Sequence, residues 1–229
     1  MRNQALPGQP VSASAPVLTA GFWRTRRAAA IAGIVFGVLL ITAMSMMRLA
    51  LSDDAFAAMQ SDGARRKMIR ISLHLVPFAG IAFLWFIGVV REQLGDIEDR
   101  LFSTVFLGSG LLFLALLFNG AVTASSMVGM LDGPNANADV WAYGLDISQG
   151  LISVYAMRMA AVFTISVSTV GLRASALPRW VSYTVYLVAL ALLLSSVGQK
   201  WIQLLFPSWV LLVSAVLLLT PPARREPSS

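Results

Sequence analysis

The sequence contains no cysteine and only one histidine among its 229 residues. The absence of cysteine excludes disulfides, iron–sulfur clusters, thiolate zinc sites and cysteine nucleophiles. A single histidine excludes the usual two-histidine metal and haem sites. We therefore expect the protein to use no metal and no cofactor.

Charged residues are also scarce. They make up 12% of the chain, against 57% hydrophobic residues, and the mean hydropathy is +0.75. Soluble domains have about 25% charged residues, so this composition excludes a soluble globular enzyme. The sequence also shows no nucleophile–base pair, no paired carboxylates and no phosphate-binding loop. These absences predict an integral membrane protein without catalytic activity.

Long apolar runs dominate what is present. A helix needs roughly 20 apolar residues to cross a bilayer, and six runs approach or exceed that length. They are Ala28–Met47, Ile69–Val90, Phe102–Gly129, Ile147–Leu172, Trp180–Val197 and Trp201–Thr220. The sequence therefore predicts an all-α, polytopic bundle of six transmembrane helices within residues 22–220. Residues 1–21 are predicted to form a disordered cytoplasmic tail, and residues 221–229 a short cytoplasmic tail.

The basic residues lie at the ends of the apolar runs, which is how multispan proteins set their topology. With the N-terminus inside, the inner segments hold Arg2, Arg24, Arg26, Arg27, Arg91, Arg100, Arg173, Arg179, Arg224 and Arg225. The outer segments hold Arg48, Arg65, Arg66, Lys67, Arg70 and Lys200. This excess predicts a multi-pass plasma-membrane protein with both termini in the cytoplasm. The acidic segment 131–146 is predicted to be an external loop, and nucleic acid is not expected as a partner because no basic patch with aromatic residues occurs.

Arg158 is the most informative residue, because it lies inside the fourth predicted span. An arginine at a helix centre costs about 2.5–3.5 kcal/mol on insertion scales, so it normally faces the bundle interior and has a partner. The nearest acid on its own helix is Asp146, about 18 Å away at 1.5 Å per residue. Three partners remain open: neutral groups such as Asn119, an anionic ligand or lipid, or a carboxylate on another subunit.

Three further polar residues, His74, Asn119 and Gln149, are predicted at similar depth above Arg158. Together they suggest a cavity that binds a solute or a lipid headgroup. The alternative is that each residue only forms hydrogen bonds between helices, which contribute about 0.6 kcal/mol on average. Both interpretations stay open at this point.

Two other groups of residues suggest contacts. The basic run Arg65, Arg66 and Lys67 is expected either to contact anionic headgroups or a partner's acidic surface, or to be solvated. Small residues at four-residue spacing predict close helix packing. These residues are Ala29, Gly33 and Gly37 in the first span, and Ala156 and Ala160 in the fourth.

Two stretches carry a resemblance. They read FLWFIGVVREQLGDIEDRLFSTVFLGSGLLF at Phe83–Phe113 and TVGLRASALPRWVSYTVYLVALALLL at Thr169–Leu194. With the Leu-Arg-x-x-x-Leu-Pro-Arg-Trp arrangement at 172–180, the chain resembles an uncharacterised family of small multispan membrane proteins of actinobacteria, including mycobacteria. Some proteins of this kind accompany larger assemblies such as the Mce lipid-import systems, so the resemblance implies an accessory membrane subunit.

We therefore expect a non-enzymatic accessory or stabilising subunit of a larger membrane complex, with lipid transport as its setting. Its partners would be membrane lipids and at least one other membrane subunit. The alternative is a small transporter or channel for a solute or lipid, which would use the polar residues around Arg158.

Overall fold

The computed structural model describes residues 17–51, 55–94, 100–134, 136–173, 179–194 and 201–219. The predicted tail at 221–229 and residues 1–16 of the predicted N-terminal tail lie outside these residues. The first helix begins at Val17, five residues before the predicted boundary at 22.

All regular structure in the described residues is helical, so the prediction of an all-α protein is confirmed. The elements are α1 (Val17–Ala50), α2 (Ala55–Ser61), α3 (Gly63–Leu94), α4 (Arg100–Met130), α5 (Ala138–Gly150), the π-helix η2 (Leu151–Ala156), α6 (Met157–Arg173), α7 (Arg179–Leu193), the 3₁₀-helix η3 (Ile202–Leu204) and α8 (Leu205–Leu219).

Five helical stretches in the described residues are long and apolar enough to cross a membrane, which indicates a membrane-embedded bundle. They are Arg27–Ala50, Gly63–Arg91, Ser103–Met130, Ala138–Thr169 and Ile202–Leu219. The prediction of six such helices is not confirmed. The predicted span Trp180–Val197 corresponds to α7, whose described apolar stretch is only Thr184–Leu193. That stretch rises about 15 Å, half of the roughly 30 Å hydrocarbon core.

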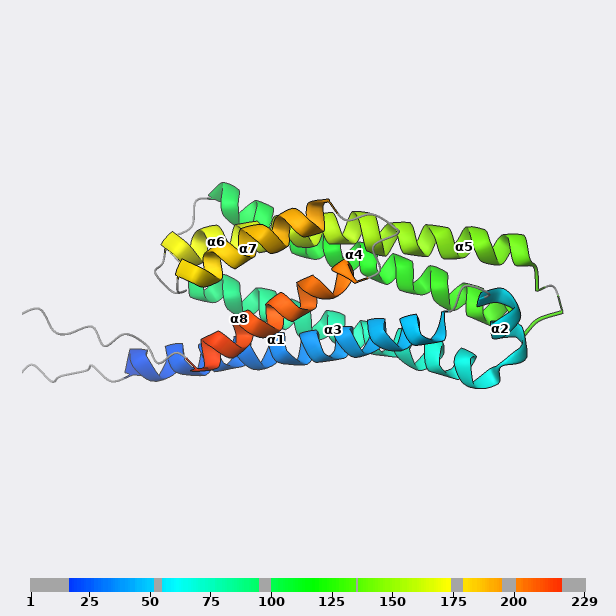
Figure 1. Ribbon diagram of the computed structural model, residues 1–229. Helices are drawn as coiled ribbons and strands as arrows, with labels where there is room; N and C mark the ends of the chain where they lie inside the picture. The colour runs from blue at the N-terminus through cyan, green and yellow to red at the C-terminus, as the bar shows by residue number, and fades with distance from the viewer. Residues whose placement is uncertain are drawn as a thin grey trace, which may run out of the picture.

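Figure 1 shows how the helices are arranged. The helices α1, α3 and α4 and the continuous rod α5–η2–α6 run along the bundle, whereas α7 and α8 form a shorter hairpin that reaches only part-way from one end. We call the end where α1 begins and α8 ends the proximal end. The opposite end, which carries α2 and the connection between α4 and α5, is the distal end. The distal half of the bundle is therefore formed mainly by α1, α3, α4 and α5.

The predicted external loop 131–146 is largely helical, because α5 begins at Ala138. Asn137 caps this helix, and its side-chain oxygen accepts hydrogen bonds from the backbone N–H groups of Asp139 (2.8 Å) and Val140 (3.2 Å). Asp139 lies in the first turn, where a negative charge is favoured by the helix dipole. Trp141 is buried and packs against Phe56 of α2, with ring centroids 6.3 Å apart. The hydropathy reading missed this helix because one of its faces is polar.

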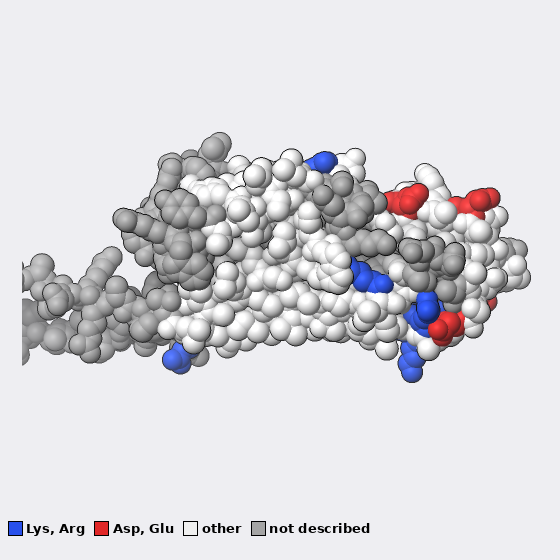
Figure 2. Space-filling model, in the orientation of Figure 1, with Lys and Arg blue, Asp and Glu red and all other residues white. Residues whose placement is uncertain are grey.

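Charged side chains of the described residues gather at the distal end (Figure 2). On the face shown, the middle of the bundle is mainly uncharged apart from isolated basic side chains, and acidic side chains are seen only toward the distal end. One ion pair at this end joins Arg70 of α3 to Asp132, just beyond α4. This distribution indicates that the distal end projects beyond the apolar part of the bundle.

The core of the bundle is aromatic. Phe36, Phe83, Phe113 and Phe206, from α1, α3, α4 and α8, are fully buried, and the centroids of their contacting rings lie 4.5–6.4 Å apart. Phe163 of α6 packs against Phe83 at 5.1 Å. Rings from five helices thus meet at one level and fill the centre of the bundle.

Candidate ligand-binding site

A cavity of about 350 Å³ lies in the distal half of the bundle, beside η3 at the tip of the α7–α8 hairpin. Its wall is mainly apolar. The apolar lining residues are Leu40, Ala43, Met44, Met47, Leu49, Leu51, Leu73, Val76, Leu117, Ala121, Leu145, Ile152 and Trp201. The polar lining residues are Arg48, Ser72, Ser148, Gln149, Ser153 and Gln203. The volume is within the range of about 300–1,000 Å³ that is usual for small-molecule sites.

Arg48, in the last turn of α1, is the central residue of the polar contacts on one side of the cavity. Its Nη2 donates a hydrogen bond to Oε1 of Gln203 at 3.3 Å, and Nε2 of Gln203 donates to Oγ of Ser153. The guanidinium carbon also lies 5.3 Å from the ring centre of Trp201, a cation–π distance. The Nη1 atom of Arg48 is buried and has no hydrogen-bond partner among the described residues. The site therefore contains a positive group with unused donors.

Two serines on the wall are already satisfied by backbone carbonyls. Ser148 donates to the carbonyl of Gly120 at 2.8 Å, which joins α5 to α4. Ser72 donates to the carbonyl of Ile69 at 2.7 Å. Gln149 is half-buried at the cavity wall, and its side chain has no hydrogen bond to another described residue. The groups free to meet a ligand are thus Arg48 and Gln149.

The π-helix η2 lies at this site. It occupies Leu151–Ala156 between α5 and α6, and its residues Ile152 and Ser153 line the cavity. π-helical turns are rare and occur frequently at functional sites. Here the turn contributes Ser153, the acceptor of the Gln203 hydrogen bond. The π-helical turn is therefore part of the cavity wall.

The aromatic core closes the proximal side of the cavity. On α1 and α4, the buried Phe36 and Phe113 lie one helical turn on the proximal side of the wall residues Leu40 and Leu117. Their ring centroids are 6.4 Å apart, and Phe206 packs against both. The cavity is therefore blind on this side, where the buried rings fill the centre of the bundle.

Arg158 does not face this cavity. Its side chain is exposed on the surface of α6, inside the apolar stretch Ala138–Thr169. It forms no hydrogen bond or ion pair with another described residue. The expected interior position is therefore wrong, and the neutral partner considered from the sequence is not used. An anionic ligand or lipid and a carboxylate on another subunit stay open as partners of Arg158.

The other predicted polar residues also lie apart. His74 is exposed, and its Nδ1 is 2.6 Å from the carbonyl oxygen of Arg70. Asn119 is exposed and donates to the carbonyl of Ala115 at 2.8 Å. Of the four residues expected to form one polar cluster, only Gln149 lines the cavity.

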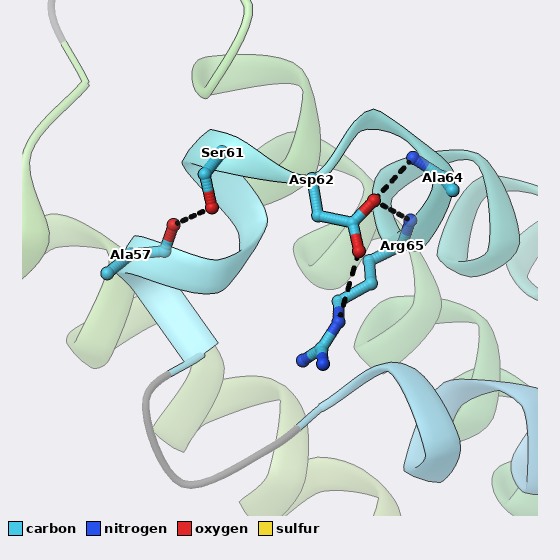
Figure 3. A network of polar contacts seen from close by, with 5 residues as sticks. All are labelled: Ala57, Ser61, Asp62, Ala64 and Arg65. Carbon is cyan, nitrogen blue, oxygen red and sulfur yellow. Dashed lines mark hydrogen bonds and ion pairs between the residues drawn. The ribbon is translucent and has the colours of Figure 1, made fainter.

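The basic run Arg65, Arg66 and Lys67 lies in the first turns of α3. Asp62 caps this helix by accepting hydrogen bonds from the backbone N–H groups of Ala64 (2.9 Å) and Arg65 (3.3 Å). Figure 3 shows that the same carboxylate also meets Nε of Arg65, at 3.3 Å.

The next two basic residues differ from each other in their contacts. Arg66 donates to the carbonyl of Gln60 at 3.2 Å. Lys67 is exposed and has no partner among the described residues. The two arginines thus stabilise the corner between α2 and α3, and Lys67 is the member of the run that is available for headgroups.

The small residues predicted for helix packing are buried within this chain. Ala29, Ala156 and Ala160 are fully buried. A Cβ atom at Gly33 would lie 2.1 Å from Oγ of Ser214, and one at Gly37 would lie 2.4 Å from Cγ of Leu211. The face with Gly33 and Gly37 therefore packs against α8 of the same chain.

Sequence reasoning missed Arg48, Trp201 and Gln203 as site residues. Arg48 and Trp201 had been read only as markers of span ends. Gln203 carries a usable signal, because it is an amide next to a long apolar run, where polar side chains normally have a partner.

Comparisons with protein-family models, with curated proteins and with solved structures find no match for this chain.

Proposed function

We propose that this protein is a non-enzymatic membrane protein that binds a lipid-like molecule in the cavity at the distal end of its bundle. The observation that carries the proposal is the cavity itself, because an apolar chamber with a few polar groups on one side suits an amphipathic ligand. The blind proximal side supports binding rather than conduction. Of the two functions that the sequence suggests, this is closest to the transporter, but it uses Arg48 in place of Arg158.

The test is to fill the cavity. Ala121 lines it and is buried, so Ala121→Phe would place a ring in the chamber. Ala115, on the same helix, is exposed, and Ala115→Phe is therefore a matched control. Both variants and the unchanged protein would be purified in a mild detergent, and the lipids that co-purify would be extracted and quantified by mass spectrometry.

We expect one lipid-like species in near-stoichiometric amount with the unchanged protein and with Ala115→Phe, and its loss with Ala121→Phe. Equal retention by all three proteins, with Ala121→Phe still folded, would show that the cavity is not the binding site.

We propose as a second candidate that the protein is also a subunit of a larger membrane complex, with lipid transport as its setting. The supporting observation is the exposed Arg158 within an apolar stretch, because an isolated charge in lipid is costly. A carboxylate on a neighbouring transmembrane helix would compensate that charge. The expected result is that Arg158→Leu lowers co-purification of a membrane partner, whereas Arg91→Leu, at an exposed position near the end of α3, does not.

The proposed orientation keeps the proximal end in the cytoplasm of a plasma-membrane protein. The beginning of α1 and the end of α8 lie at this same end (Figure 1), which supports termini on one side of the membrane. The excess of basic residues in the predicted inner segments supports the cytoplasmic side. The cavity would then face the outer part of the membrane.

A further inference from the structure

The charge on the cavity wall narrows the class of ligand. Among the described residues that line the cavity, Arg48 is the only charged one, and none is Asp or Glu. The dipole of α1 favours a positive charge at this C-terminal position. The dipole does not explain why Nη1 is buried without an acceptor, because a buried donor without a partner is costly. An acidic group of a ligand would supply that acceptor.

The number of charges favours a singly charged head group. One guanidinium is present, and its Nη2 is partly used by Gln203. A carboxylate carries one negative charge, whereas a phosphate monoester carries about −1.5 to −2 near neutral pH. A phosphate monoester would therefore remain partly uncompensated in this cavity. Guanidinium–carboxylate pairing is also among the strongest hydrogen bonds in proteins.

The size of the cavity favours a single chain. A volume of about 350 Å³ is at the lower end of the range of about 300–1,000 Å³ that is usual for small-molecule sites. A ligand with one chain of medium length suits such a volume better than a phospholipid with two long chains.

The positions of the wall residues also indicate how the ligand's hydrocarbon chain would be oriented. Arg48 lies at the distal side of the chamber and Leu40 lies eight residues earlier on α1, about 12 Å nearer the proximal end. Between them Ala43, Met44 and Met47 offer an apolar surface. The head group would lie beside Trp201, which is exposed, and the tail would point toward the aromatic core.

We propose, on the basis of the lipid-binding function above, that the ligand is a medium-chain fatty acid whose carboxylate accepts hydrogen bonds from Nη1 of Arg48. The acid binds in its ionised form, and its chain lies along α1 toward Leu40. Gln149, the other free polar side chain of the wall, is available to the second carboxylate oxygen.

The experiment compares three probes of equal chain length on the unchanged protein. The protein is placed in nanodiscs of neutral phosphatidylcholine at pH 8, where a carboxylic acid with an ordinary pKa is ionised. Binding of radiolabelled dodecanoic acid is measured, with empty nanodiscs as the blank. Methyl dodecanoate and dodecyl phosphate then compete for the site. We expect dodecanoic acid to bind roughly tenfold to a hundredfold more tightly than its methyl ester, as the loss of one charged hydrogen bond implies.

Variants of the cavity residues test whether binding of the acid depends on Arg48 and on the cavity. Arg48→Gln removes the charge and should weaken the acid by a similar factor while leaving the methyl ester unchanged. Arg48→Lys keeps the charge and should restore part of the affinity. Ala121→Phe should abolish binding of all three probes, and Ala115→Phe should change none. The probe series on the unchanged protein decides the question even if an Arg48 variant does not fold.

The possible failures are distinct. If the methyl ester binds as tightly as the acid and Arg48→Gln has no effect, the acidic ligand is refuted while the lipid-binding function stands. If dodecyl phosphate binds more than tenfold more tightly than the acid, the carboxylate is refuted in favour of a phosphate head group. If no probe binds above the blank and Ala121→Phe changes nothing, the lipid-binding function itself fails.

Discussion

The contact between α1 and α8 at Gly37 gives the sharpest test of the fold. A Cβ atom added at Gly37 would lie 2.4 Å from Cγ of Leu211 and 3.0 Å from the carbonyl oxygen of Pro207. The leucine side chain can rotate away only in part, and the carbonyl belongs to the backbone of α8. Gly37→Ala should therefore push α1 and α8 apart.

Two opposing terms set the size of the effect. Overpacking a well-filled contact costs about 1–3 kcal/mol. Replacing glycine by alanine inside a helix gains about 1 kcal/mol through helix propensity. The net loss expected for Gly37→Ala is about 0–2 kcal/mol. Gly108, on α4, has nothing within 4 Å of an added Cβ, so Gly108→Ala should show only the gain. The difference between the two variants isolates the packing cost of about 1–3 kcal/mol.

The assay is reversible unfolding in mixed micelles with increasing SDS, followed by circular dichroism. The double variant Gly37→Ala with Leu211→Ala should recover part of the stability that Gly37→Ala loses, because it removes the atoms nearest to the new Cβ. If Gly37→Ala and Gly108→Ala shift the unfolding midpoint equally, or if Leu211→Ala gives no rescue, the close contact of α1 with α8 is refuted.

Other predictions address the core, the cap of α5, the distal ion pair and the orientation. Phe206→Ala should lower the free energy of unfolding by about 2–4 kcal/mol in the same SDS assay. This loss does not exceed that of similar substitutions in soluble cores, because lipid replaces water as the reference medium. A loss under about 1 kcal/mol would contradict the central position of this ring. Asn137→Ala should cost about 1 kcal/mol and increase hydrogen exchange at the start of α5, and unchanged exchange would contradict the cap. Asp132→Ala should cost less than about 1 kcal/mol because its ion pair is half exposed, and a larger loss would mean that the pair is not solvent-screened. The native chain has no cysteine, so single-cysteine variants report orientation directly: a membrane-impermeant maleimide applied to intact cells should label Ser61→Cys and not Arg91→Cys, and the reverse pattern would invert the proposed topology.

Hydropathy predicted the parts of the fold that depend on composition alone. The apolar runs that begin at Ala28, Ile69 and Phe102 each lie within one long helix, and the run that begins at Trp201 corresponds to the helical stretch Ile202–Leu219. The cap at Asp62 was also predictable, because an aspartate before a helical run is a local signal that needs no tertiary contact.

The structure of the distal end could not be predicted from hydropathy. Helix α5 carries Asp139 and Asp146 on one face and buries Trp141 on another. A hydropathy average over such a segment is that of a loop. The burial of Trp141 depends on Phe56 of α2, which lies far away in the sequence. Only the tertiary arrangement shows that this segment packs.

Arg158 and Arg48 illustrate the same limit for the site. Sequence position distinguishes depth along a helix but not the direction in which a side chain points, so Arg158 appeared more informative than Arg48. In the structure Arg158 is exposed, whereas Arg48 is partly buried. Its neighbours Trp201 and Gln203 lie more than 150 residues away in the sequence. They reach the end of α1 because the α7–α8 hairpin stops part-way along the bundle, as Figure 1 shows. Trp201 and Gln203 therefore complete the cavity wall beside Arg48 through contacts that neither hydropathy nor the number of spans could predict.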